Sequence, residues 1–370
     1  MLGGLDMNDE LKFACHSKTP ECLGTVLSHP TRNLSAFPAT VERIADDNLR
    51  IWYSDITKNV FTIARAEGNL KRGFKPMRFR LHDRFVAKAS TPTLGNLPKE
   101  WMPTQPVHIM LPSGGFRLYF WAHCYKQGIV RYLAADSDDG VAYNVVNTHS
   151  PCLYHYCDRA GNPRLPGISG LADLRSKVKR PACEQMSPPE LVCNDATTVY
   201  RLPDQSFEVY SAAIISVRKD SPEYIPWDNC PGKRRLIRRW TSMDGLHFIP
   251  SGTVLAPDEN DHPWIQFYYL SVRHRPDGTR DGIIGLYDVL AQRMDFERCV
   301  SKDGIRWHRE RKIWLDRKPG EVCVYAVGTP FISDGDHELL FYTAFNYTHN
   351  AKYRIGKKLK GDIRCVRFLT

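Results

Sequence analysis

The chain of 370 residues contains 51 Lys and Arg against 41 Asp and Glu, a formal net charge of +10, and 42% of its residues are hydrophobic. These fractions are typical of a soluble globular protein and exclude a chain too polar to bury a core. No apolar run approaches the roughly 18–20 residues that a membrane-spanning helix needs. The stretch Met1–Lys12 has no basic segment followed by an apolar one, so we expect no signal peptide and a cytoplasmic protein.

The eleven cysteines do not form a metal or disulfide framework that can be recognised from spacing. Their number is odd, and no pair has the Cys-x-x-Cys spacing of zinc and redox motifs. Cys152 and Cys157, with His155 between them, come nearest to a metal cluster but fit no standard zinc site. We therefore expect free thiols, as in a reducing compartment, and neither a metal nor a cofactor.

The basic residues gather at Lys233–Arg235, Arg238–Arg239, 175–180 and Lys357–Lys358. Such clusters are found in proteins that bind nucleic acids or phosphate. They are also common on solvated strand faces and loops, which is the interpretation we favour. Nucleic acid is therefore not an expected partner.

In chain order, a short strand with a central aromatic residue recurs five times. From Trp52 to Phe341 there are four intervals, which gives about 72 residues per unit. The five copies are Arg50–Tyr53, Arg117–Phe120, Glu208–Ser211, Gly285–Asp288 and Leu339–Tyr342.

A second repeated element has the pattern Ser-x-Asp-Gly, then an aliphatic residue, any residue and an aromatic one. It occurs at Ser137–Tyr143, where Ala142 precedes the aromatic residue, at Ser242–Phe248 and at Ser301–Trp307. The pattern is typical of a tight turn between strands, since Asp caps backbone N–H groups and Gly accepts a positive φ. One copy would indicate a hairpin, whereas three indicate a repeat.

The sequence of each unit predicts four antiparallel strands. Five such units predict an all-β, five-bladed β-propeller that forms a single domain over residues 1–370. The last unit ends after its third strand, 362–369. The segment Gly24–Leu27 copies Gly252–Leu255, so we expect residues 12–27 to complete the last blade and close the ring. Insertion loops are expected near 152–189 and 219–232.

With these units and turns, the chain resembles the five-bladed propeller glycosidases of glycoside hydrolase families 32, 43, 62, 68 and 130. The segment Cys193–Thr197, followed by Tyr200 and Phe207–Tyr210, looks like the less characterised bacterial members of that group. The resemblance implies that acidic residues at the starts of the innermost strands face a central funnel. Hydrolysis would need two carboxyl groups across the scissile bond.

By that rule the candidate catalytic residues are Asp195, Asp261 (or Glu259) and Glu321. Asp195 stands before a β-branched run and could instead cap a turn. Asp261 lies in a polar loop where a solvated cluster is the alternative, and Glu321 could be an ordinary strand-edge residue. The first two units begin without an acid, which departs from the better-known families.

Aromatic and amide side chains near the same strand starts are candidate substrate-binding groups. Sugars stack their CH faces on aromatic rings and hydrogen-bond through their hydroxyl groups. Trp52 and Trp240 are expected in the core instead. The candidates are Asn33, Trp101, Gln105, Asn194, Trp264 and His349.

Together these features predict a glycoside hydrolase that acts on a furanoside or small oligosaccharide. Two alternatives stay open: a glycoside phosphorylase with a basic phosphate site, and a propeller that only binds carbohydrate or protein. The sequence leaves linkage, stereochemistry and oligomeric state open.

Overall fold

A computed structural model describes residues 20–57, 60–81, 91–158, 189–226, 228 and 230–369. Within these ranges the chain is all-β, and the one helical element is a 3-10 turn, η1, at Pro189–Leu191. No helix of the described part has the length and apolar character needed to cross a bilayer. Residues 1–19 and 159–188, which include much of the predicted closing segment and first insertion loop, lie outside the described residues.

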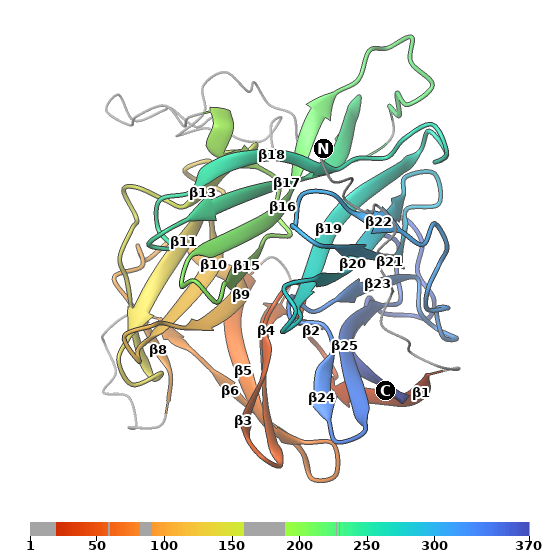
Figure 1. The fold of residues 1–370 in the computed structure, drawn as a ribbon. Helices are drawn as coiled ribbons and strands as arrows, with labels where there is room; N and C mark the ends of the chain where they lie inside the picture. The colour runs from red at the N-terminus through yellow and green to blue at the C-terminus, as the bar shows by residue number, and fades with distance from the viewer. Residues whose placement is uncertain are drawn as a thin grey trace, which may run out of the picture.

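The strands form four hydrogen-bonded sheets, which we divide into five strand groups in chain order (Figure 1). The main strands of each group pair antiparallel, whereas the short β7, β8 and β14 of group 2 make parallel pairs. Group 1 contains β2 (Asn33–Ser35), β3 (Val41–Ala45), β4 (Asn48–Thr57), β5 (Val60–Asn69) and β6 (Gly73–Arg78). Group 2 contains β9 (Met102–Met110), β10 (Phe116–Cys124), β11 (Ile129–Ser137) and β12 (Ala142–Val145), extended by β7 (Arg80–Leu81), β8 (Thr93–Gly95), β13 (Leu153–His155) and β14 (Val192–Cys193).

The remaining groups follow the same antiparallel order. Group 3 contains β15 (Thr198–Arg201), β16 (Phe207–Ser216), β17 (Lys233–Ser242) and β18 (Ile249–Leu255). Group 4 contains β19 (Ile265–His274), β20 (Arg280–Asp288), β21 (Arg293–Ser301) and β22 (His308–Arg309). Group 5 contains β23 (Cys323–Ala326), β24 (Ile332–Asp334), β25 (His337–Phe345), β26 (Gly361–Leu369) and β1 (Glu21–Leu27). Groups 4 and 5 share one sheet through a single bridge between Met294 and Cys323.

The strand nearest the N-terminus pairs with the strand nearest the C-terminus, as the likeness of Gly24–Leu27 to Gly252–Leu255 predicted. β1 lies antiparallel to β26, with Glu21 opposite Arg367 and Leu27 opposite Ile363. The Arg367 guanidinium donates to the Glu21 carboxylate, with the closer nitrogen at 2.5 Å. β1 thereby covers an edge of β26 that would otherwise expose unpaired backbone groups.

The Ser-x-Asp-Gly turns have the predicted geometry. In the copy after β17, the Asp244 carboxylate accepts hydrogen bonds from the N–H groups of Leu246 and His247, each at 2.8 Å. Gly245 has a φ of 69°, which an L side chain rarely adopts. Its N–H donates to Ser242 Oγ at 2.9 Å. The copies at Ser137 and Ser301 repeat these bonds.

Each turn also contacts the preceding strand group. The Tyr119 hydroxyl of group 2 donates to the Gly245 carbonyl at 2.8 Å, and the Tyr210 hydroxyl of group 3 donates to the Gly304 carbonyl at 3.3 Å. Both tyrosines are fully buried and belong to the repeated aromatic strands. The two sequence repeats therefore meet each other across the interfaces between groups.

The core lies between the strand groups, where apolar side chains of neighbouring sheets interdigitate. Trp52, Trp121 and Trp240 are completely buried, which confirms the core placement predicted for Trp52 and Trp240. Because the strands alternate in direction, the starts of the first strands and the loops between second and third strands lie at one end of the molecule. We call this the entry end. The described residues of the loops 217–232 and 346–360 lie there, and the Ser-x-Asp-Gly turns lie at the opposite end.

Candidate functional site

Asp195 occupies the centre of a polar cluster at the entry end. It lies between β14 and β15, and its side chain is half-buried. Gln105 Nε2, on β9, donates to Asp195 Oδ2 at 3.3 Å, and the Tyr268 hydroxyl, on β19, donates to Oδ1 at 3.4 Å. Side chains from groups 2, 3 and 4 therefore meet at one carboxylate. A residue that only caps a turn accepts hydrogen bonds from backbone N–H groups of that turn. The donors to Asp195 are instead side chains of two other strands.

The Gln105 amide is fixed in orientation by a second bond. Its Oε1 accepts from the Ala196 N–H at 3.1 Å, so the opposite side of the amide presents its N–H group to Asp195. Gln105 and Ala196 both adopt left-handed backbone conformations, with φ of 57° and 64°. Such conformations cost energy in residues other than glycine and are frequent at functional sites.

Asn194 lies beside Asp195, and its side-chain oxygen accepts a hydrogen bond from His155. His155 Nδ1 accepts from the Cys157 N–H at 3.1 Å, so the ring proton lies on Nε2, which donates to Asn194 Oδ1 at 3.0 Å. Burial lowers the pKa of His155 to about 3, which keeps the imidazole neutral. This arrangement indicates a positioning role for Asn194.

A buried ion pair between Arg235 and Asp228 lies next to Tyr268. Arg235 is 1% exposed, and its Nη1 donates to Asp228 Oδ2 at 2.9 Å and to Gln266 Oε1 at 2.6 Å. The Tyr287 hydroxyl donates to the other oxygen of Asp228 at 2.8 Å. Burial alone would raise the pKa of Asp228, but the charge and hydrogen bond of Arg235 outweigh it and hold the pKa below its usual value.

The prediction that the cluster Lys233–Arg235 is a solvated surface is wrong for Arg235. Its guanidinium lies 5.3 Å from the ring centroid of Tyr268 and 5.2 Å from that of Tyr287. A buried cation is stable only when it is paired, and here Asp228 and two aromatic faces supply the pairing. Sequence reasoning missed Asp228, Tyr268 and Tyr287 as site residues. The predicted 219–232 insertion contains three acidic residues, Asp220, Glu223 and Asp228, and nothing in its sequence distinguishes Asp228.

His349 brings the fifth strand group into the same cluster. The Tyr325 hydroxyl lies 3.1 Å from His349 Nδ1, and the ring centroids of Tyr268 and Tyr287 each lie 4.9 Å from that of His349. Burial, with a smaller contribution from the positive Arg235, lowers the pKa of His349 to about 4. The imidazole is therefore neutral near pH 7, and Nδ1 can accept the Tyr325 proton.

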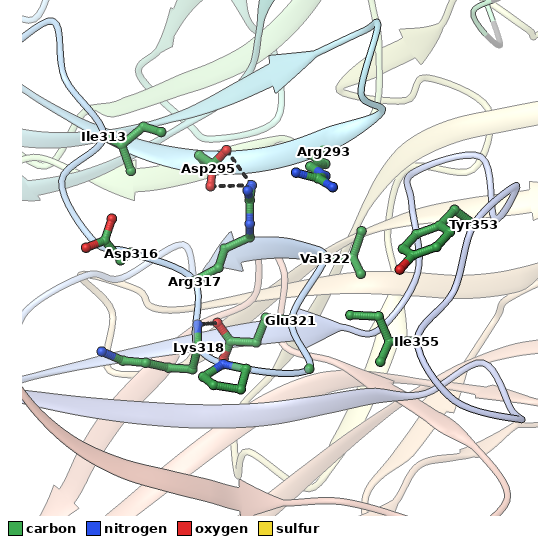
Figure 2. A pocket seen from close by; sticks show the side chains of 12 residues that line it. Arg293, Asp295, Ile313, Asp316, Arg317, Lys318, Glu321, Val322, Tyr353 and Ile355 are labelled. Atoms are coloured by element: carbon green, nitrogen blue, oxygen red, sulfur yellow. Dashed lines mark hydrogen bonds and ion pairs between the residues drawn. The ribbon is translucent and has the colours of Figure 1, made fainter.

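The other two candidate acids lie in separate ion-pair networks. The Asp261 carboxylate accepts two hydrogen bonds from Arg309, at 2.7 and 2.8 Å. Glu321 accepts from the Arg364 guanidinium and the Tyr342 hydroxyl at 2.9 Å each, and from the Lys318 N–H at 2.7 Å. Figure 2 shows Glu321 beside a surface pocket. No hydrogen bond among the described residues joins either acid to Asp195.

The candidate aromatic platforms also lie apart from Asp195. Trp101 is 7% exposed, and its Nε1 donates to Gln127 Oε1 at 3.1 Å. It lines a separate cavity of about 420 Å³ together with Arg131 and His149. Trp264 stacks on His262 with a centroid distance of 4.7 Å. Asn33 begins β2, and its buried Oδ1 has no hydrogen-bond partner within the described ranges.

The described residues contain no group of three His, Cys, Asp or Glu side chains placed to hold a metal ion. The described cysteines are free thiols, and Cys152 accepts a hydrogen bond from Asn147 Nδ2 at 3.2 Å. The cluster at Asp195 is thus built from carboxylate, amide, phenol and imidazole groups. Those groups can bind sugar hydroxyls and transfer protons.

Structural comparison identifies similar folds, whereas the sequence matches no protein-family model and no curated protein. A glycoside hydrolase superposes with a TM-score of 0.58 at 12% identity, over 95% of this chain and 92% of the other. A thermostable family-43 glycoside hydrolase gives a TM-score of 0.55 at 12% identity, over 92% of both chains. The chain has the fold of the propeller glycoside hydrolases. The resemblance predicted from the repeats is therefore confirmed for the fold.

A third similar structure comes from the GH130 family of mannoside phosphorylases, which contains glycoside hydrolases that target β-1,2 mannosidic linkages in Candida mannan. It superposes with a TM-score of 0.52 at 11% identity, over 94% of this chain and 93% of that one. Phosphorylases and hydrolases are thus both named for the family of that structure. The fold by itself does not choose between them.

Proposed function

We propose that the five strand groups are the blades of one closed five-bladed propeller spanning the whole chain. The pairing of β1 with β26 supports closure of the last blade. Contacts between the turn of one group and the tyrosine of the preceding one support a regular ring. In this arrangement the cluster around Asp195 lies at the mouth of the central funnel.

We propose that the protein is a glycoside hydrolase whose general acid is Asp195. The observation that carries this proposal is the set of contacts to its carboxylate, which come from an uncharged amide and a phenol on two other groups. Asp228 and Asp261 are each bound by an arginine, which helps to hold the pKa of either carboxyl below its usual value, and Glu321 is bound by Arg364. Among these described carboxylates, Asp195 alone has no cation in contact. This difference supports a role for Asp195 in proton transfer.

In this mechanism Asp195 protonates the leaving glycosidic oxygen while a nucleophile reaches the anomeric carbon from the other side of the sugar. Gln105 and Tyr268 hold the carboxyl group in place. Tyr268 and Tyr287 are 6% and 0% exposed, so they support the carboxyl group from inside the protein rather than offer a ring face to the sugar. The substrate we propose is a furanoside or small oligosaccharide. Asp261 and Glu321 remain predictions for the second carboxyl group.

Phosphorolysis is the second candidate, and one observation favours it. The other carboxylate of the cluster, Asp228, is 5% exposed and is occupied by Arg235 and Tyr287, so it is poorly placed to activate water. A phosphorylase needs only one acid, because inorganic phosphate is the nucleophile. The likeness to the GH130 structure supports both reactions equally.

The free thiols of the described residues support a reducing compartment such as the cytoplasm. Cys152, Cys193 and Cys323 are deeply buried, so folding does not depend on oxidising them.

The test is an assay of the purified full chain on aryl furanosides, aryl pyranosides and small oligosaccharides, each with and without inorganic phosphate. Release of the aglycone without phosphate supports hydrolysis. Formation of a sugar 1-phosphate that depends on added phosphate supports phosphorolysis. Binding of a sugar without turnover of any substrate would favour a propeller that only binds carbohydrate.

A further inference from the structure

A second pocket lies at the entry end, between strand groups 4 and 5 (Figure 2). It has a volume of about 470 Å³, which is enough for a sugar unit. Arg293 and the segment from Asp316 to Val322 form one part of it, and Tyr353 and Ile355 of the loop 346–360 form another. The pocket thus combines cations, an aromatic ring and aliphatic side chains.

The acidic side chains of the pocket are largely neutralised inside the protein. Arg317 Nη1 donates to both oxygens of Asp295 at 2.6 Å, and Glu321 is bound by Arg364. Arg293 is exposed at the start of β21, and no ion pair involving it occurs among the described residues. After these pairings, the described charged lining residues without an ion pair are two cations, Arg293 and Lys318, and one acid, Asp316.

The neighbouring loop adds more positive charge. Residues 351–360 contain five Lys and Arg and no Asp or Glu. Lys360 is compensated by Asp362, with 3.0 Å between Nζ and the carboxylate, and Lys352 is also engaged within the protein. The loop also exposes Tyr353, of which 55% of the surface is accessible, and Ile355, of which 40% is accessible.

The loop is held in a defined shape by Asn346 at its base. Asn346 Nδ2 donates to the carbonyls of Ile355 at 2.6 Å and Lys358 at 2.9 Å, and its Oδ1 accepts from the Lys360 N–H at 2.7 Å. Like charges in one ordered loop repel each other and destabilise it. An anionic ligand would relieve that repulsion.

The pocket adjoins the Asp195 cluster through His349. The backbone N–H of His349 donates to the backbone carbonyl of Gln292 at 2.9 Å, and Gln292 directly precedes Arg293. Tyr353 follows His349 by four positions in the same loop. The Asp195 cluster and the pocket therefore both involve the loop 346–360.

We propose that this pocket binds a negatively charged sugar unit, a uronate, of an oligosaccharide whose reacting unit lies at Asp195. This inference rests on the proposed function. Arginine suits a carboxylate because its planar guanidinium donates two parallel hydrogen bonds. Tyr353 and Ile355 offer apolar surface to the CH face of the ring. Three cations, Arg293, Arg317 and Lys318, line this one pocket, whereas a nucleic acid would need cations along an extended track.

The test is calorimetric binding of tetragalacturonate to the full chain carrying Asp195→Asn, which prevents turnover during the titration. Fully methyl-esterified tetragalacturonate is the neutral probe of matched shape. We expect the acid to bind at least about tenfold more tightly than the ester, since an ion-paired hydrogen bond corresponds to about that factor. The preference should shrink as NaCl is raised from about 0.05 M to about 0.3 M, because salt screens exposed charges.

Arg293→Gln and the double variant Lys357→Gln/Lys358→Gln should each weaken binding of the acid about five- to tenfold and leave the ester unaffected. The matched control is Lys302→Gln, which removes an exposed cation at the opposite end of β21. Lys302→Gln should leave both affinities unchanged.

Equal binding of acid and ester, no binding of either, or an equal loss in Lys302→Gln would overturn the proposal. Tighter binding of a single-stranded RNA of equal charge would also overturn it, in favour of a nucleic-acid surface. Failure of the proposed function is a separate result, because it appears as absence of turnover by the wild-type chain. A wild type that cleaves neutral glycosides but does not prefer the acid would support the proposed function and contradict the proposed uronate pocket.

Discussion

Gln105 and Asp195 meet across two strand groups, with Gln105 Nε2 3.3 Å from Asp195 Oδ2. The same amide accepts the Ala196 N–H at 3.1 Å, so one side chain fixes both the carboxylate and the backbone that follows it. The relationship ties the proposed acid to a neighbouring sheet rather than to its own turn. Its chemical consequences can be tested by changing the Gln105 amide.

Gln105→Glu should shift the pH dependence of activity. A second carboxylate beside Asp195 raises the pKa of Asp195, because two like charges disfavour ionisation. We expect the basic limb of the kcat/KM profile to move upward by about one pH unit. Gln105→Ala should instead lower kcat by about tenfold without that shift, because it removes a positioning group but adds no charge. Identical profiles for the two variants would contradict the assignment.

The buried histidines predict a loss of stability in mild acid. Burial lowers the pKa of His155 to about 3 and of His349 to about 4, against an unfolded value of 6.5. Below about pH 6.5 the unfolded chain binds protons that the folded chain does not. The free energy of unfolding therefore decreases as the pH is lowered. Each such histidine contributes a slope of up to about 1.4 kcal/mol per pH unit.

The measurement is urea unfolding at intervals from about pH 7 to about pH 5, a range in which these two histidines stay neutral only in the folded state. His155→Gln, which retains a donor for Asn194, should show a shallower slope than the wild type. His308→Gln is the control, because the His308 side chain is exposed on β22 and makes no hydrogen bond or ion pair within the described residues. An unchanged slope in His155→Gln would argue against a neutral buried imidazole.

Deletion of residues 1–27 should leave an insoluble or unfolded protein. The deletion removes β1 together with the apolar contacts of Leu27, and it exposes the edge of β26. Glu21→Gln is the control, since it removes only the exposed ion pair with Arg367 and should change stability by less than about 1 kcal/mol. Recovery of a folded, cooperative monomer after the deletion would refute the closing role of β1.

Tyr119→Phe should destabilise the protein by about 1–3 kcal/mol, because it leaves the buried Gly245 carbonyl without its hydroxyl donor. Tyr125→Phe is a matched control, as Tyr125 is 49% exposed and makes no hydrogen bond through its hydroxyl within the described ranges. Equilibrium unfolding in urea measures both changes. Equal stability of the two variants would mean that the contact between turn and preceding group adds little.

Much of the fold could be predicted because its signals are local. The Ser-x-Asp-Gly turns encode their geometry within seven residues, and Gly24–Leu27 repeats the strand pattern of Gly252–Leu255. Asp195 and Gln105 could be named because the sequence places both near predicted strand starts, although β9 begins at Met102 and Gln105 lies within it. The bond between them was not predictable, since it joins residues 90 positions apart.

The rest of the site depends on pairing that spacing does not encode. Arg235 lies in a run of bases, Lys233–Arg235, and nothing in that run distinguishes the one that becomes buried. Tyr268 lies between two other aromatic residues, so the facing side chain cannot be chosen from the sequence. The pairing of β19 with β20 is irregular between Phe267 and Leu270, and this irregularity disrupts the strand's simple alternation at Tyr268.

The central claim is that Asp195 is the general acid of a glycosidase, and Asp195→Asn tests it most directly. The substitution is nearly isosteric, so circular dichroism and the unfolding midpoint should match the wild type. The decisive measurement is kcat/KM of this variant beside Asp261→Asn and Glu321→Gln, on the best substrate found with or without phosphate. The account predicts a loss of about 10²–10⁴-fold in Asp195→Asn, the largest of the three. Activity of Asp195→Asn within a few-fold of wild type, with a larger loss in either other variant, would contradict it.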